Sequence, residues 1–202
     1  MFANPQPREN YERTRLAAAN QVAFLLKQPE ALEPILAMAR IDRTVYQHSV
    51  NVSAIAVGLA AFVGAPLDAC SALGLGGLLH DLGKSPAAHS APAGSTAVPD
   101  WRQHPRAGAG LLLNRDYVSR DVLDIILLHE ERLDGRGYPG GVKKIDHVFQ
   151  IIGLANFYDR LVTIEGRDPS RAYNEIASLH PAPYHEVLIA GLKDVLVANK
   201  IC

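Results

Sequence analysis

Apolar residues recur along this chain at the spacing of buried helix faces. The clearest case is residues 45–62, where steps of seven, three, four and three separate the apolar positions Val45, Val52, Ile55, Leu59 and Phe62. Further helices are predicted at 11–27, 30–40, 66–82, 107–114, 119–131, 147–165, 169–179 and 184–199. No segment shows convincing two-residue alternation of a half-buried strand. The pattern therefore predicts an all-α, compact helical bundle.

Two segments break the helical pattern. Residues 85–103 are rich in Ala, Pro, Ser and Gly, and DGRGYPGG at 134–141 holds too many turn-forming residues to continue a helix. Long loops are often functional, and we expect the first segment to form a mobile cover near a site. We expect residues 1–40 to be an N-terminal helical extension and residues 41–202 to form one domain.

Composition and net charge exclude several classes of protein for this chain. With 48% hydrophobic residues the chain of 202 residues can bury a core, yet no apolar run reaches the ~18 residues of a membrane span. The N-terminus lacks the apolar segment of a signal peptide, and two cysteines, Cys70 and Cys202, argue against a disulfide framework. We expect a cytoplasmic protein that acts on no membrane. A net charge of −1 gives no global attraction for a nucleic acid polymer, so local cations or metals must hold any anionic ligand.

Four of the histidines have informative surroundings. His48 and His129 fall on apolar helix stripes, His80 precedes Asp81 at the end of an apolar helix, and His104 follows the loop rich in Ala and Pro. A lone inward histidine is more often a core residue bonded to a carbonyl. Several on separate helices need partners for their ring nitrogens, and a divalent ion such as iron, manganese or zinc is one such partner. Both interpretations stay open at this point.

The pair His80–Asp81 indicates how many metal ions a site at this place would hold. Adjacent helical residues diverge by about 100°, so both cannot point straight at one ion unless it lies between them. A carboxylate can reach sideways and use its second oxygen on another ion, which favours a two-metal centre. Lys84, one turn beyond His80, is placed to approach a bound phosphate; a solvated lysine at a helix end is the alternative.

These residues resemble the HD phosphohydrolase superfamily, and its HD-GYP branch in particular. The matching pieces are HSVNV, LLHDLGK, the HP pair at 104–105, HEERLDGRGYP at 129–139 and IIGLANFYDRL at 151–161, in the family's order. The resemblance implies hydrolysis of cyclic di-GMP at a centre of divalent transition metal ions, two of them in our expectation (Fe, Mn or Zn). It implies that the metal ligands are His48, His80, Asp81, His104 and His129. It also gives Lys84 and Asp81 catalytic roles, with Lys84 neutralising charge on the phosphate.

The chain departs from the family pattern at two positions. Glu130 stands where the family usually has a second histidine, and Asn156 stands where it usually has an aspartate. We expect both to belong to the metal site, with Glu130 supplying the carboxylate that Asn156 lacks; a solvated Glu130 in a degenerate site is the alternative. The function is then either a cyclic di-GMP phosphodiesterase, or an impaired module that binds a nucleotide or a signalling protein partner through the GYP loop. Hydrolysis of another nucleotide phosphate is a related option.

Overall fold

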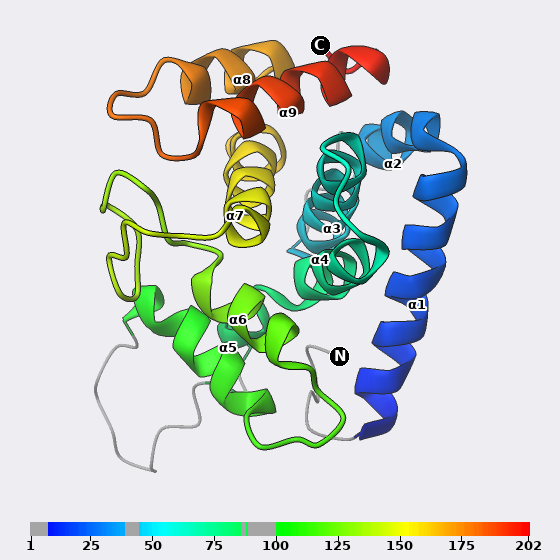
Figure 1. Ribbon diagram of the computed structural model, residues 1–202, viewed down its shortest axis with the longest axis vertical. Helices are drawn as coiled ribbons and strands as arrows, with labels where there is room; N and C mark the ends of the chain where they lie inside the picture. The colour runs from blue at the N-terminus through cyan, green and yellow to red at the C-terminus, as the bar shows by residue number, and fades with distance from the viewer. Residues whose placement is uncertain (1–7, 39–44, 86–87, 89–99) are drawn as a thin grey trace.

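The computed structural model describes residues 8–38, 45–85, 88 and 100–202 (Figure 1). Its α-helices are α1 (Arg8–Lys27), α2 (Leu32–Met38), α3 (Val45–Phe62), α4 (Leu67–Leu79), α5 (His104–Leu112), α6 (Arg120–Leu128), α7 (His147–Asp159), α8 (Pro169–Ala177) and α9 (Glu186–Ala198). Short 3₁₀ turns are η1 (Pro29–Ala31), η2 (Leu82–Lys84) and η4 (Trp101–Gln103), and α7 runs on into a π-helical turn, η5 (Arg160–Ile164). The described ranges hold no strand, so the all-α prediction is confirmed. Most of segment 85–103, with the cover predicted there, lies outside the described residues.

Helix α3 is the centre of the bundle. It packs against α4 and α7, and also against α1, α2 and α9. In Figure 1, α1 runs along the outer side of α3 and α4, whereas α8 and α9 lie across one end of α7. Helices α5 and α6 pack together near the other end, and α5 also contacts η2. The ends of α4 and α6 and the start of α5 are thereby brought towards α3 and α7.

The apolar stripe of α3 is buried as predicted over most of its length. Val52, Ile55 and Leu59 are fully buried. Phe62 is 54% exposed, so its assignment to the core was wrong. It is the last residue of α3 and borders a surface pocket instead of the interior.

The N-terminal helices pack on the same core. Val22 and Leu25 of α1 and Leu32 of α2 belong to the apolar cluster that contains the α3 stripe. Leu16, also on α1, is 61% exposed. The proposed boundary at residue 40 lies outside the described residues and stays a prediction.

The helix ends differ from the sequence predictions where the candidate site lies. Helix α4 ends at Leu79, and Asp81 has φ −93° and ψ 12°, so the HD pair lies just after the helix and not inside it. Helix α6 likewise ends at Leu128. Gly83, in η2, lies against the start of α5, and a Cβ at this position would overlap the backbone carbonyl of His104. Only glycine lets η2 lie directly against α5.

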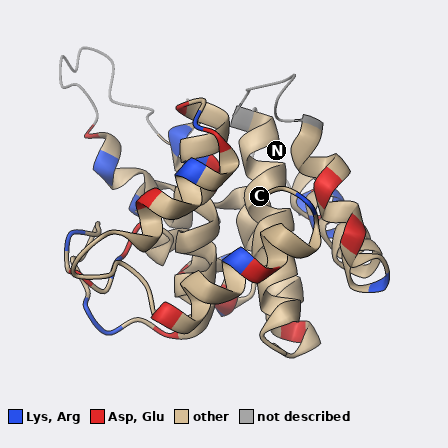
Figure 2. Cartoon of the chain, turned by 90° about the horizontal axis from the view of Figure 1, so that it is seen from above, with Lys and Arg blue, Asp and Glu red and all other residues tan. Residues whose placement is uncertain are grey.

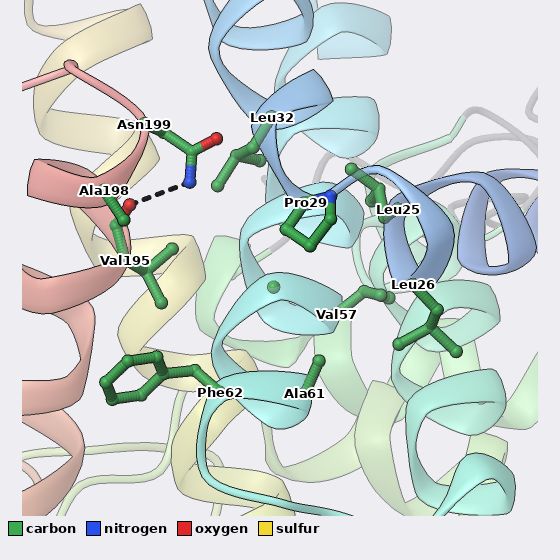
Figure 3. A pocket seen from close by; sticks show the side chains of 11 residues that line it. Leu25, Leu26, Pro29, Leu32, Val57, Ala61, Phe62, Val195, Ala198 and Asn199 are labelled. Atoms are coloured by element: carbon green, nitrogen blue, oxygen red, sulfur yellow. Dashed lines mark hydrogen bonds between the residues drawn. The ribbon is translucent and has the colours of Figure 1, made fainter.

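Positively and negatively charged residues are mixed along the described part of the chain. Figure 2 shows Lys and Arg interspersed with Asp and Glu over the described helices and loops. A pocket of about 440 Å³ lies between η1, α3 and α9, and mainly apolar side chains line it (Figure 3). None of the described residues that line this pocket is a histidine, carboxylate, lysine or arginine, so they lack the chemistry that the sequence pointed to. Among the described helices, none is long and apolar enough to cross a bilayer.

Candidate metal centre

Five predicted ligands come together at one buried point. His48 lies on α3, His80 and Asp81 follow α4, His104 begins α5 and His129 follows α6. Each of them is at most 4% exposed. Ligand atoms of His48, His80 and Asp81 lie within 4.8 Å of one another, and so do those of Asp81, His104 and His129. Asp81 belongs to both groups, so one carboxylate is placed between two candidate ion positions.

All four histidines are held through the same ring nitrogen. Each Nδ1 lies 2.7–2.8 Å from an oxygen. Three of these are backbone carbonyl oxygens, which can only accept a hydrogen bond. The fourth belongs to the carboxylate of Asp159, which can only accept when it is ionised. The acceptors are Asp159 Oδ2 for His48, Gly77 O for His80, Trp101 O for His104 and Ile126 O for His129. Nδ1 therefore carries the proton, and each Nε2 presents its lone pair.

The lone pairs need a cation between them. Nε2 of His104 and Nε2 of His129 are 3.0 Å apart, and neither has a proton to share in these tautomers. Nε2 of His80 and Oδ1 of Asp81 are buried without a hydrogen-bond partner. Nε2 of His48 lies 3.1 Å from the acceptor oxygen Oδ1 of Asn156. Facing acceptors without a donor are costly in a protein interior, and a metal ion removes that cost. Imidazole and carboxylate donors suit a divalent transition metal, so the residues present fit one.

The protonation states of the buried side chains also favour a metal site. Burial lowers the pKa of His80 and of His129 to about 3. Burial alone would raise the pKa of Asp81, but it lies well below its usual range, and the Lys84 ammonium group in contact with the carboxylate favours its ionised form. At neutral pH His80 and His129 are therefore neutral and Asp81 is ionised, the forms that bind metals.

Lys84 lies at the edge of the centre. Its Nζ donates to Oδ2 of Asp81 at 2.8 Å, and its side chain is 46% exposed. The ammonium group thus touches the carboxylate shared by the two groups while it remains open to solvent. This placement lets it meet a phosphate that approaches from solvent.

Glu130 and Asn156, the two residues that depart from the family pattern, contact each other. Asn156 Nδ2 donates to Glu130 Oε1 at 3.2 Å, while Asn156 Oδ1 faces His48. Glu130 Oε1 is 3.8 Å from His129 Nε2, and the Glu130 side chain is only 15% exposed. Glu130 therefore borders the histidine cluster, and the alternative of a carboxylate pointing into solvent does not hold.

Asp159 has a larger part than the sequence indicated. Its buried carboxylate accepts hydrogen bonds from His48 Nδ1 at 2.7 Å, from Asn51 Nδ2 at 2.9 Å and from Thr163 Oγ1 at 2.9 Å. Carboxylate–histidine pairs of this kind fix the orientation of metal-binding imidazoles. From the sequence alone, Asp159 is only a less likely substitute ligand for the metal site. The signal in the sequence was its spacing of three residues from Asn156, which puts both on one helix face.

Glu131 was missed altogether. It is 1% exposed, and its carboxylate accepts hydrogen bonds from the backbone N–H groups of Gly140 and Val142, the latter at 2.8 Å. Gly137 fits beside it because a Cβ there would meet the Glu130 carbonyl oxygen at 2.6 Å. Glu131 thus holds the loop at 134–141 next to His129. Nothing in the sequence distinguishes it from a solvated glutamate.

Comparisons with known proteins agree with this geometry. Residues 45–172 match the HD domain. The chain is 34% identical to a cyclic di-GMP phosphodiesterase of Pseudomonas aeruginosa over 148 residues, which is 70% of this chain and 36% of that protein. It is 29% identical to the 3'3'-cGAMP-specific phosphodiesterase 1 of Vibrio cholerae over 164 residues, or 76% of this chain and 37% of that one. The solved structure of an HDG"Y"P protein from Bdellovibrio bacteriovorus superimposes with a TM-score of 0.82 at 30% identity, covering 97% of this chain and 66% of that one.

The match spans more than half of the chain, and the motifs lie at the buried centre. The chain therefore belongs to the HD domain family, and its resemblance to the HD-GYP branch is confirmed. It spans little more than a third of the length of these two curated relatives.

Proposed function

We propose that this chain is a metal-dependent phosphodiesterase that hydrolyses a cyclic dinucleotide of the cyclic di-GMP type, and that it acts in the cytoplasm. The observation that carries the proposal is the pair of ligand groups that share Asp81. A phosphodiester needs cationic charge on its oxygens and an activated water, and a two-ion site supplies both. The names of the two curated relatives support the choice of substrate class.

In this proposal two divalent ions, iron, manganese or zinc, are held by these two groups. One set is His48, His80 and Asp81, and the other is Asp81, His104 and His129. Glu130 extends the second set, and Asn156 extends the first through its amide oxygen. The bound ions would supply Lewis acidity towards the phosphate and lower the pKa of a coordinated water.

The chain's own residues do the remaining work. Lys84 binds a non-bridging phosphate oxygen and stabilises the charge that develops on it. Asp81 keeps the ligand sets together and holds Lys84 at the phosphate side through their 2.8 Å contact. Asp159 keeps His48 in the tautomer that presents Nε2.

One observation favours a second function. Asn156 is a neutral residue beside His48, and a neutral amide binds a divalent cation less well than a carboxylate. A weakly loaded centre would leave a module that binds a nucleotide, or a signalling protein through the loop at 134–141. This candidate predicts binding of cyclic di-GMP without turnover.

A metal analysis coupled to an activity assay tests the proposal. Protein purified without oxygen should contain close to two transition metal ions per chain and should hydrolyse cyclic di-GMP or 3'3'-cGAMP. Lys84→Ala should keep the metal and lose roughly ten- to hundredfold in kcat/KM. Lys193→Ala, which removes an exposed lysine of α9, serves as the control. A metal-loaded protein that leaves both cyclic dinucleotides intact would overturn the proposal in favour of the binding module.

A further inference from the structure

An exposed tryptophan lies beside the metal centre. Trp101 is the first residue of η4 and is 58% exposed, although large aromatic side chains usually bury most of their surface. Its ring meets the ring of Tyr138 edge-on, with the centroids 5.3 Å apart. The centroid of the Tyr138 ring is in turn 5.9 Å from that of His104. One aromatic side chain therefore separates the indole from a candidate metal ligand.

The position of Trp101 is fixed by the same ligand. Its backbone carbonyl accepts the hydrogen bond from His104 Nδ1 at 2.7 Å. The Asp100 side chain caps η4 by accepting from the Arg102 backbone N–H at 3.0 Å, and η4 leads directly into α5. The backbone of Trp101 is thus tied to the centre, while its ring stays open to solvent.

The surroundings of the ring are cationic and aromatic. The guanidinium carbon of Arg102 lies 5.6 Å from the centre of the Trp101 ring system. Tyr138, from the loop at 134–141, covers one part of the indole, and more than half of the side chain remains uncovered. An exposed indole next to an arginine is the combination on which nucleobases stack in proteins that bind single-stranded nucleic acids.

We propose that Trp101, assisted by Arg102, is the platform on which a purine base of the substrate stacks while its phosphate lies at the metal centre. This inference rests on the proposed function and adds a specificity-determining residue to it. The metal centre recognises only the phosphodiester, which any dinucleotide offers. A stacking surface adds selectivity for a ligand with a large aromatic base, and it accepts guanine and adenine alike because both have a π face.

Trp101 is the only tryptophan of the chain, so its fluorescence reports on the platform directly. The metal-loaded protein is mixed with cyclic di-GMP in a stopped-flow instrument, and emission is followed during the first turnover. We expect the base to quench the emission, whereas inorganic phosphate at saturating concentration leaves it nearly unchanged. Equal responses to both ligands, or no response to either, would overturn the proposal.

Variants give an independent measurement. Trp101→Ala should raise KM for cyclic di-GMP roughly tenfold to hundredfold, because loss of one stacked base costs affinity of that order. Its kcat and its inhibition constant for inorganic phosphate should stay close to those of the wild type. Trp101→Phe, which keeps a flat aromatic ring, should restore most of the affinity. Phe24→Ala is the matched control, since Phe24 is 47% exposed on α1 and lies outside the site.

The outcomes separate this inference from the proposed function. If cyclic di-GMP quenches the tryptophan but is not hydrolysed, the platform stands and the enzymatic proposal fails. If it is hydrolysed with an unchanged KM in Trp101→Ala and without quenching in the wild type, the platform fails and the enzymatic proposal stands. Should Trp101→Ala lose metal, the wild-type fluorescence and the Trp101→Phe affinity decide the question.

Discussion

The charge of Glu130 gives the most direct test of how this centre holds its metal. Glu130→Gln removes one negative charge and keeps an oxygen that can accept the hydrogen bond of Asn156 Nδ2, now at 3.2 Å. The variant therefore isolates the charge from the shape of the site. We expect the metal affinity to fall.

The structure sets the size of the effect. Glu130 Oε1 is 3.8 Å from His129 Nε2, so the carboxylate can come within about 4 Å of an ion bound there. Two unit charges at about 4 Å interact by about 4 kcal/mol at an effective dielectric constant near 20, and a divalent ion doubles this to about 8 kcal/mol. Water screens part of this, since 15% of the side chain is exposed. We therefore expect a loss of at least ~1.4 kcal/mol, or a tenfold weaker metal affinity.

Asn156→Asp should act in the opposite direction. One of the new carboxylate oxygens would replace an amide nitrogen that lies 3.2 Å from Glu130 Oε1. Two like charges at this distance destabilise the metal-free fold, whereas an ion would be attracted to both. The melting temperature of the metal-free protein should fall, and the metal affinity should rise.

The double variant decides whether the two positions compensate. If charge has moved from position 156 to position 130, Glu130→Gln with Asn156→Asp should return close to the wild-type affinity in an anaerobic competition titration against a chelator. Asp194→Asn, at an exposed position of α9, controls for loss of charge as such. A double variant that binds metal as weakly as Glu130→Gln alone would refute the compensation, because a carboxylate at position 156 would then not replace the charge lost at position 130. Full metal occupancy in Glu130→Gln would remove Glu130 from the site.

Three further predictions follow from the contacts around the centre. Asp159→Asn should weaken metal binding about ten- to hundredfold, since an amide can donate to His48 Nδ1 and shift the proton to Nε2; an unchanged chelator titration would contradict this. Glu131→Ala should lower the free energy of unfolding by roughly 2–4 kcal/mol, because the backbone N–H groups of Gly140 and Val142 lose a charged acceptor; urea denaturation measures it, and a loss below ~0.5 kcal/mol would count against the contact. The metal-free protein should lose stability as pH falls from 6.5 towards 3, because His80 and His129 take up protons only when unfolded. The slope should approach ~1.4 kcal/mol per pH unit for each histidine, and flat stability across this range by calorimetry would show that the two histidines are not buried neutral.

Local sequence patterns predicted the helices and pointed to the inward-facing histidines, and the resemblance to the HD-GYP branch made them ligand candidates. Helical periodicity placed His48 on the buried side of α3, and the HD pair stood where an apolar helix ends. The order of the motifs indicated that these residues meet, and the structure brings them within one cluster. This worked because the period of a helix determines which of its own residues point inwards, whatever the partner helix is.

The contacts that tune the site depended on the tertiary structure. Asp159 reaches His48 across 111 positions of sequence, and Asn156 reaches Glu130 across 26. Glu131 has the same residue type as its neighbour Glu130, yet its carboxylate points into the 134–141 loop, whereas that of Glu130 borders the histidines. Periodicity along one helix carries no information about which polar group of another helix lies opposite. That choice is made when α3, α6 and α7 pack, because each buried polar group must then find its partner among the few within reach.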